Sequence, residues 1–341
     1  MAVIDEIELH LHAELQREVL PKLIKLFPRI QFIITSHSPL FLLGMQEEFG
    51  DDGFDIYEMP DANKISTEQF SEFENAYRYF QNTNRYQKEI KDAINQHVAK
   101  TLIITEGSTD WRHMKAAQQY LAENDTEMAW LGDAEFEFLE YDPPNSNFDR
   151  IKLQMSSSEL KSLAKENSKI RQSRKLIIIA DRDVSDVVKE LAGKESYKDW
   201  GNNVYSLCLP IPKHRKETPE ICIEHYYQDE EIRRETVCED GICRRIYLGY
   251  EFDTHGRSLE KNGKYCTNIK SCGENKIHII DGNDNNKVYD ALSEKDTNYA
   301  LSKMNFANKV LAKEAPFDQM DFSSFKDLFS VIREILNKPL L

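Results

Sequence analysis

The sequence lacks the long apolar runs of a membrane protein. A helix that crosses a bilayer needs ~20 consecutive apolar residues, and the most apolar segment, residues 31–45, is interrupted by Ser36-His37-Ser38-Pro39. The N-terminal residues also lack the basic and apolar stretches of a secretory signal. We therefore expect a cytoplasmic protein that has no membrane partner.

An excess of positive charge is missing as well. The 341 residues include 59 acidic and 44 basic ones, which gives a formal net charge of −15. A protein that coats nucleic acid is disfavoured, because binding to phosphates needs local positive charge. A nuclease remains open, since its active site is acidic and its contacts with the nucleic-acid backbone can be local. The candidates for such contacts, each with solvated surface charge as its alternative, are Lys169, Arg171, Arg174, Lys175, Lys213, His214, Arg215 and Lys216.

Cysteine is scarce, with six residues, and no secretory signal accompanies it. Structural disulfides are therefore not expected. Cys238, Cys243, Cys266 and Cys272 lie in one stretch of the sequence. Their C-x4-C and C-x5-C spacings are looser than those of common zinc-finger ligands. A structural zinc site and a set of reduced thiols both remain open for this group.

The sequence does contain two short hydrophobic runs that end in carboxylates. Residues 102–105 lead into Glu106, and residues 176–180 lead into Asp181 and Asp183. Both runs predict buried strands of a parallel sheet. Because ligands bind at the carboxyl ends of such strands, the carboxylates are predicted to share one crevice and to bind Mg²⁺ or Mn²⁺ through their oxygens. A helix N-cap is the alternative for either aspartate alone, but that role does not explain Glu106.

Three further carboxylates are candidates for the same metal site. Asp110 follows Glu106 by four residues, so it is predicted to lie one turn into the next helix on a nearby face. Glu220 and Glu224 are four residues apart and are predicted to share a helix face. One of them would complete a second metal position ~4 Å from the first, as two-metal hydrolysis requires. A solvated acidic face is the alternative for this pair.

The order of the predicted elements indicates an α/β fold. From residue 100 onward strands and helices alternate, which is typical of a mostly parallel sheet. The predicted strands span 101–105, 136–141, 175–180 and 204–209, and the predicted helices span 109–123, 157–167, 184–192 and 219–227. Ahead of them, the sequence predicts strands at 2–4, 31–35 and 54–59 and a helix at 13–26. The predicted parts of the chain are residues 1–60, a helical linker at 61–99, a catalytic domain at 100–235, a Cys-containing β-rich insertion at 236–290 and amphipathic helices at 291–341.

The two acidic strand ends resemble a known domain. Strand-Glu-Gly at 102–107 and strand-Asp-x-Asp at 176–183, separated by two βα units, are similar to the Toprim domain over residues 100–230. The Toprim family includes topoisomerases, primases and nucleases. The resemblance implies a Rossmann-like fold in which Glu106, Asp181 and Asp183 surround Mg²⁺.

The first 45 residues resemble a different family. Residues 3–6 (VIDE) look like the Walker B strand of ABC-type ATPases, residues 8–12 (ELHLH) like the D-loop-like segment after it, and residues 35–39 (TSHSP) like the switch-histidine loop. The resemblance implies that Asp5 binds Mg²⁺, that Glu6 polarises the attacking water and that His37 approaches the γ-phosphate of ATP. The sequence contains neither a G-x4-G-K-[ST] phosphate loop nor an ABC signature. We therefore expect ATP binding and hydrolysis only together with the missing part of the ATPase domain.

An ABC-type ATPase followed by a Toprim domain is the arrangement of the OLD (overcoming lysogenization defect) nucleases, whose relatives include antiphage nucleases of Gabija and retron systems. The resemblance covers most of the chain apart from the Cys-containing insertion. It implies a DNA endonuclease with two metal ions, a homo-oligomer formed through the ATPase part, and a defence-system partner that is a protein or a nucleic acid. It also implies a catalytic lysine near the C-terminus, for which Lys303 matches best and Lys309 is the alternative.

Two other functions remain open. One is a Toprim topoisomerase or primase, and the other is a regulatory module that assembles a defence complex without cutting nucleic acid. A topoisomerase would require a tyrosine nucleophile, and the sequence contains 15 tyrosines. Metal-dependent cleavage of DNA, and covalent adducts between protein and DNA, separate the three functions.

Overall fold

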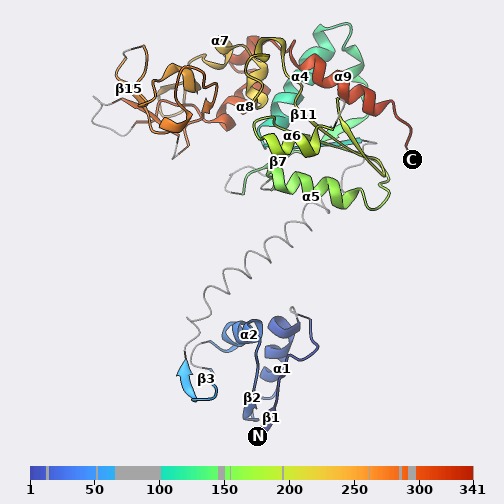
Figure 1. Ribbon diagram of the computed structural model, residues 1–341, viewed down its shortest axis with the longest axis vertical. Coiled ribbons are helices and arrows are strands. Elements are labelled where there is room, and N and C mark those ends of the chain that lie inside the picture. Colours follow the sequence, from blue (N-terminus) through green and yellow to red (C-terminus); the bar gives the residue numbers. More distant parts are fainter. Residues whose placement is uncertain are drawn as a thin grey trace. The chain divides into compact units, whose positions relative to one another are not determined.

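The chain divides into two compact units, Met1–Lys91 and Asp92–Leu341. The computed structural model (Figure 1) describes residues 1–12, 15–50, 53–65, 101–144, 150–153, 155–193, 196–260, 262–283, 286–290 and 297–340. From residue 66 on, the predicted linker at 61–99 falls outside these described residues. Within the described part of the chain, no helix combines the length and the apolar character needed to cross a membrane.

The first unit begins with a small parallel sheet. β1 (Ala2–Ile4) pairs in parallel with β2 (Phe32–Ile34). Between them, a π-helical turn (Leu15–Val19) continues into α1 (Leu20–Lys25). The strands predicted at 2–4 and 31–35, and the helix predicted between them, are confirmed in the described residues.

A helix and a hairpin complete the first unit. α2 (Pro39–Phe49) begins after Ser38, whose hydroxyl accepts a hydrogen bond from the Phe41 amide at 3.2 Å. Serine at the N-cap followed by proline is a common helix start, yet this helix is absent from the sequence predictions. β3 (Ile56–Glu58) lies where a strand was predicted and pairs with β4 (Asn63–Ile65) in antiparallel fashion. The start of the predicted helical linker is therefore a strand.

The second unit is built on a five-stranded sheet in the order β10-β11-β9-β5-β6. β5, β6, β9 and β11 run parallel, and β10 is an antiparallel edge strand. The strands span Thr101–Thr105 (β5), Phe136–Phe138 (β6), Lys175–Ala180 (β9), Lys198–Gly201 (β10) and Val204–Cys208 (β11). Every residue of β5, β9 and β11 is buried, as expected at the centre of a parallel sheet. The predicted α/β fold with a mostly parallel sheet is confirmed.

Helices connect the parallel strands. α4 (Asp110–Asn124) leads from β5 to β6, α5 (Ser157–Asn167) precedes β9, and α6 (Ser185–Leu191) leads from β9 towards β11. α5 and α6 lie next to each other against β9 and β11, whereas α4 packs against α8 (Lys303–Leu311), as Figure 1 shows. Right-handed crossovers that run in opposite directions along a sheet place their helices on opposite faces. Both faces of the sheet are therefore covered.

The strand order reverses between β5 and β9. From β5 the chain moves outward to β6, returns past β5 to β9, and then moves outward again to β11. Crossovers that diverge from such a point leave a crevice at the carboxyl ends of the two strands, where α/β sheets bind ligands. The residues that follow these two strands are Glu106 and Asp181.

A β-rich region follows the sheet. Its antiparallel pairs join β12 (Thr236–Val237) with β13 (Cys243–Arg244), β14 (Tyr247–Leu248) with β16 (Ile279–Ile280), and β15 (Lys264–Cys266) with β17 (Val288–Asp290). These strands enclose a small core made of Tyr247, Phe252, Cys266, Cys272, Ile280, Val288 and Ala300. The chain then forms α8 and α9 (Phe325–Leu336), whose apolar side chains are buried along one face.

Short helical turns fill the connections. α7 spans Asp229–Ile232. The 3-10 helices span Ala129–Gly132, Lys213–Arg215, Ile223–Tyr226, Gly249–Glu251, Ile269–Ser271 and Phe317–Gln319.

Two predictions for the sheet region are wrong in detail. The strand predicted at 136–141 divides into β6 and β7 (Tyr141–Asp142), and β7 pairs with β8 (Ile151–Lys152) outside the main sheet. The helix predicted at 219–227 is a single 3-10 turn, because Cys222 before it is extended, with φ −111° and ψ 175°. The segment that carries Glu224 is consequently shaped by its contacts with other parts of the fold.

Candidate active site

Glu106 and Asp181 lie together at the carboxyl ends of β5 and β9. The Glu106 amide donates to the Ile179 carbonyl at 3.1 Å and so continues the pairing of the two strands. The Asp181 amide donates to Glu106 Oε2 at 3.2 Å, and the hydroxyl of Ser157, at the start of α5, donates to Glu106 Oε1 at 2.6 Å. Both oxygens of Glu106 are therefore fixed by neighbouring elements. Ser157 was not among the predicted site residues, because nothing in the local sequence links it to Glu106.

Asp110 joins this pair from the first residue of α4. Its Oδ2 accepts a hydrogen bond from the Gly107 amide at 2.6 Å, and the residue is 6% exposed. A side chain at position 107 would collide with the Asp110 carboxylate, so the turn after β5 needs glycine there. The Tyr141 hydroxyl donates to the Glu106 carbonyl at 2.8 Å and holds the same turn from the other side.

Glu224 and Lys303 complete the group. Glu224 lies in the 3-10 turn after β11 and is fully buried, and the ammonium group of Lys303, at the first residue of α8, donates to its Oε2 at 3.1 Å. Lys303 Nζ is also 3.5 Å from Cys222 Sγ. Lys309 instead pairs with the exposed carboxylate of Glu314 at 2.9 Å. Of the two candidate lysines, Lys303 is the one at the acidic group.

Burial and neighbouring charges shift the pKa values of Asp110, Asp181 and Glu224. Burial and the neighbouring charges of Glu224 and Glu106 raise the pKa of Asp110 to about 7, although the Gly107 amide and Lys303 act in the opposite direction. Negative charge on Asp110 is therefore costly in this arrangement at neutral pH.

The pKa values of Asp181 and Glu224 shift in opposite directions. Burial, followed by the charge of Asp110, raises the pKa of Asp181 well above its usual value. Burial alone would raise the pKa of Glu224, but Lys303 and His113 outweigh it and bring the pKa to about 2. Glu224 thus stays ionised as the partner of Lys303, and the two aspartates lack a comparable cation.

The donor set has the chemistry that Mg²⁺ and Mn²⁺ prefer. All four carboxylates offer hard oxygen ligands, and Asp181 Oδ1 and Glu224 Oε1 are buried without a hydrogen-bond partner. In the described part of the chain, however, no group of three or more His, Cys, Asp and Glu side chains is arranged to hold a metal ion. Metal binding would therefore require these carboxylates to turn towards a common point.

Two predicted ligands lie outside the buried group. Asp183 follows β9 by three residues and is exposed. Glu220 is also exposed, whereas Glu224 is buried. The prediction that Glu220 and Glu224 share a helix face is wrong, because the chain between them is extended and the helical turn begins at Ile223.

The four late cysteines form two separate kinds of environment. Cys266 and Cys272 are buried in the small β-rich core and hydrogen-bond to each other. Cys238 and Cys243 lie at the hairpin of β12 and β13, where Cys243 is exposed. Neither pair belongs to a metal-binding group of three or more among the described residues. All six cysteines are free, and the structural zinc site and the set of reduced thiols both stay predictions.

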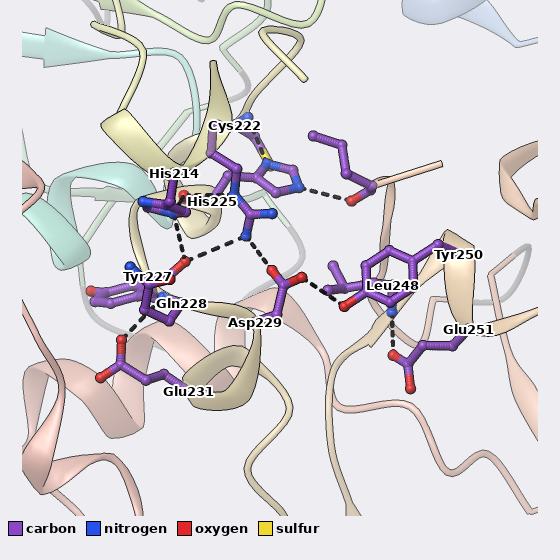
Figure 2. Close-up of polar contacts among 12 residues, drawn as sticks. His214, Cys222, His225, Tyr227, Gln228, Asp229, Glu231, Leu248, Tyr250 and Glu251 are labelled. Atoms are coloured by element: carbon purple, nitrogen blue, oxygen red, sulfur yellow. Dashed lines mark hydrogen bonds and ion pairs between the residues drawn. The ribbon is translucent and has the colours of Figure 1, made fainter. Parts of the chain in front are cut away.

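A polar network fixes the segment that carries Glu224 (Figure 2). His225 Nδ1 accepts a hydrogen bond from the Cys222 amide at 3.0 Å, so Nε2 carries the proton that it donates to the Ile277 carbonyl at 2.8 Å. Burial lowers the pKa of His225 to about 4 and keeps its ring neutral. Further along, Asp229 accepts a hydrogen bond from the Tyr250 hydroxyl at 2.6 Å. The β-rich region is thus bonded directly to the segment that forms the site.

Two of the basic residues proposed as nucleic-acid contacts have structural roles instead. Lys175 is buried and donates to the Leu336 carbonyl at 2.7 Å. Arg215 is buried and pairs with Asp229. A charge that is enclosed and bonded within the protein does not contact phosphate, so both predictions are wrong.

The ATPase-like residues of the first unit lie close together at the ends of β1 and β2. The Thr35 hydroxyl donates to Asp5, and the Glu6 amide donates to that hydroxyl oxygen at 2.9 Å. His37 Nε2 is 4.0 Å from Glu6 Oε1, and the His37 side chain is 89% exposed. Asp5 and Glu6 are also exposed. The predicted residues therefore share one exposed edge of the small sheet.

Comparison with known proteins finds a family that matches the segment containing this edge. Residues 2–43 match the family described as "AAA domain, putative AbiEii toxin, Type IV TA system". The N-terminal segment is therefore similar to AAA-type ATPase domains. The family match ends before the acidic group of the second unit begins.

Curated relatives match short segments of the chain. It is 48% identical over 48 residues to the retron Vc95 probable ATPase of Vibrio cholerae serotype O1 biovar El Tor. It is 54% identical over 39 residues to the retron Ec83 probable ATPase of Escherichia coli, and 47% identical over 45 residues to the Septu protein PtuA of Bacillus mycoides (strain KBAB4). The matches cover 14%, 11% and 13% of this chain and 9%, 7% and 6% of the relatives, in the same order.

Proposed function

We propose that this chain is the nuclease-bearing part of an ATPase-linked antiphage-defence protein of the OLD type, and that its second unit is a Toprim domain that hydrolyses DNA phosphodiesters with Mg²⁺ or Mn²⁺. The observation that carries the proposal is the group Glu106, Asp110, Asp181, Glu224 and Lys303 at the reversal of the strand order. The similarity of the first unit to retron ATPases and to PtuA supports a role in defence.

Each residue has a defined part in this proposal. Glu106, Asp110, Asp181 and Glu224 would hold the divalent cations, with Asp183 adding a further carboxylate. Bound cations would supply a water of lowered pKa and a counter-charge for the leaving oxygen. Lys303 would stabilise the negative charge that develops on the phosphate, because its ammonium group is held beside the acidic group by Glu224.

Control by ATP is proposed for the first unit. Asp5 would bind the Mg²⁺ of the nucleotide, Glu6 would polarise water and His37 would reach the γ-phosphate, once the rest of an ATPase domain is present. The exposure of all three side chains at one sheet edge supports this role. Dimerisation or higher assembly through the ATPase part, and a protein or nucleic-acid partner from the same defence system, belong to the same proposal.

The test is a titration of Mg²⁺ and Mn²⁺ against supercoiled, linear and single-stranded DNA, with single-stranded RNA as a fourth substrate. We expect metal-dependent cleavage that EDTA abolishes and that Asp181→Asn removes. Relaxation accompanied by a covalent adduct between protein and DNA would instead identify a topoisomerase. Tight binding of a defence partner without any cleavage would identify a regulatory module.

A further inference from the structure

A buried histidine beside the acidic group is left without a full set of partners. His113 lies on α4, three residues after Asp110, and is fully buried. Its Nδ1 is 2.9 Å from the Tyr227 hydroxyl, and its ring packs against Phe306 with the centroids 5.2 Å apart. Its Nε2 is buried and has no hydrogen-bond partner. An unpaired buried polar atom of this kind destabilises the folded protein.

Glu224 also has a buried side-chain atom without a hydrogen-bond partner. Its Oε2 is occupied by Lys303 at 3.1 Å, but its Oε1 is buried without a partner. Electrostatic interaction also links the two residues. Beyond the effect of burial, Glu224 has the strongest influence on the pKa of His113, and His113 contributes to the low pKa of Glu224. One unpaired nitrogen and one unpaired carboxylate oxygen thus belong to neighbouring side chains.

The Tyr227 hydroxyl is the hydrogen-bond partner of His113 Nδ1, at 2.9 Å. A tyrosine hydroxyl can donate or accept, so this contact alone is compatible with either tautomer of the ring. A carboxylate oxygen such as Glu224 Oε1 can only accept, so a contact with it requires the proton on Nε2. Nδ1 is then the acceptor and the Tyr227 hydroxyl is the donor.

We propose that His113 is a positioning residue for Glu224: Nε2–H of His113 binds Oε1 of Glu224, while Nδ1 accepts from the Tyr227 hydroxyl, and this contact holds the carboxylate ready for a divalent cation. This inference rests on the proposed metal-dependent function of the acidic group. Groups that orient a metal ligand in this manner change metal affinity or activity by about 10- to 100-fold when they are removed. Lys303 keeps its contact with Oε2 in this arrangement.

Three variants of the full chain test the proposal. His113→Phe keeps an aromatic ring against Phe306 but removes both nitrogens. His113→Gln places an amide N–H near the position of Nε2, and Tyr227→Phe removes the hydroxyl that hydrogen-bonds to Nδ1. Tyr226→Phe is the matched control, because Tyr226 is equally buried and its hydroxyl donates to the Pro210 carbonyl at 2.7 Å, away from His113.

The primary measurement is the affinity for Mn²⁺, obtained from the electron paramagnetic resonance signal of the free ion. We expect His113→Phe to weaken binding about 10- to 100-fold, Tyr227→Phe to weaken it less, and His113→Gln to recover most of the loss. Tyr226→Phe should bind like the wild type. In cleavage assays, kcat should fall in His113→Phe while KM for DNA stays unchanged, because the substrate contacts are intact.

The outcomes separate this inference from the proposed function. If Asp181→Asn abolishes cleavage and Mn²⁺ binding but His113→Phe leaves both within twofold of the wild type, the positioning role is refuted and the nuclease stands. If the wild type binds Mn²⁺ without cleaving any substrate, the nuclease proposal fails, and the Mn²⁺ affinities still decide the role of His113. If His113→Phe does not fold, Tyr227→Phe decides, and a wild-type affinity in that variant would refute the inference.

Discussion

Two regions of the molecule carry clusters of metal-ligating residue types, and the structure treats them differently. In the crevice at the carboxyl ends of β5 and β9, burial and repulsion raise the pKa values of Asp110 and Asp181, and carboxylate oxygens lack partners. In the β-rich region, the free thiols of Cys266 and Cys272 hydrogen-bond to each other inside an apolar core. Charge on the carboxylates of the first cluster destabilises the folded protein, whereas the buried thiols of the second have hydrogen-bond partners. Residue type and spacing suggested both sites, but topology supports one of them.

The largest effect should come from Asp181→Asn in the crevice. The substitution removes a proposed ligand without changing the size of the side chain, so we expect DNA cleavage with Mn²⁺ to fall on the order of 10³-fold. Asp186→Asn is the control, because that carboxylate is 76% exposed on α6 and pairs with Lys189. Plasmid cleavage measured for both variants tests the contrast, and a fully active Asp181→Asn would remove the crevice from the mechanism.

Lys303→Met should have the next largest effect, on stability. It leaves the carboxylate of Glu224 buried and without its cation, which costs roughly 3–5 kcal/mol of unfolding free energy. Lys309→Met is the matched control, since Glu314 is 55% exposed and surface pairs contribute about 0–1 kcal/mol. Urea unfolding at pH 7 should separate the two. Equal midpoints would mean that the buried pair adds nothing.

The pH dependence of Asp110→Asn sharpens the comparison further. Because the folded-state pKa of Asp110 is raised to about 7, its ionisation destabilises the folded state as pH rises from about 4 to about 7. Asparagine carries no charge, so the variant should be more stable than the wild type by about 1–4 kcal/mol at pH 8. The difference should vanish near pH 4. A constant difference at both pH values in urea unfolding would contradict the electrostatic origin.

The smallest effect is expected in the β-rich region. Cys238→Ser should leave the free energy of unfolding within about 0.5 kcal/mol of the wild type, because the thiol holds no metal in this interpretation. Elemental analysis of the purified protein should find no zinc in either form. A stoichiometric zinc ion that is lost on Cys238→Ser would reverse the contrast between the two regions.

The sequence predicted the elements that depend on local signals. β5, β9 and α5 lie within a residue of their predicted bounds, because continuous apolar runs and serine N-caps mark them. The turn that carries Glu224 was predicted as a helix, since its conformation is fixed by His225 and Ile277, 52 residues apart in the sequence. A local sequence pattern cannot reveal a partner that is so distant in the sequence.

The same limit applies to the candidate site. The strand ends and the residues just after them indicated Glu106, Asp110 and Asp181, and a family resemblance indicated Lys303. Neither signal indicated His113. Its partner Tyr227 is 114 residues away, and a lone histidine on a helix is no signal. Its position three residues after Asp110 was the one available clue, since residues at that spacing share a helix face.

The reversal of strand order between β5 and β9 also determines how the chain tolerates changes in length. Glu106 and Asp181 are 75 residues apart in the sequence, yet adjacent central strands set their separation. We therefore expect an insertion in the connection between α6 and β10 to leave the pairing of β5 with β9 and the hydrogen bond between the two residues unchanged. Engineers could place a tag, a hinge or a whole domain in this connection and keep the spacing of the two carboxylates.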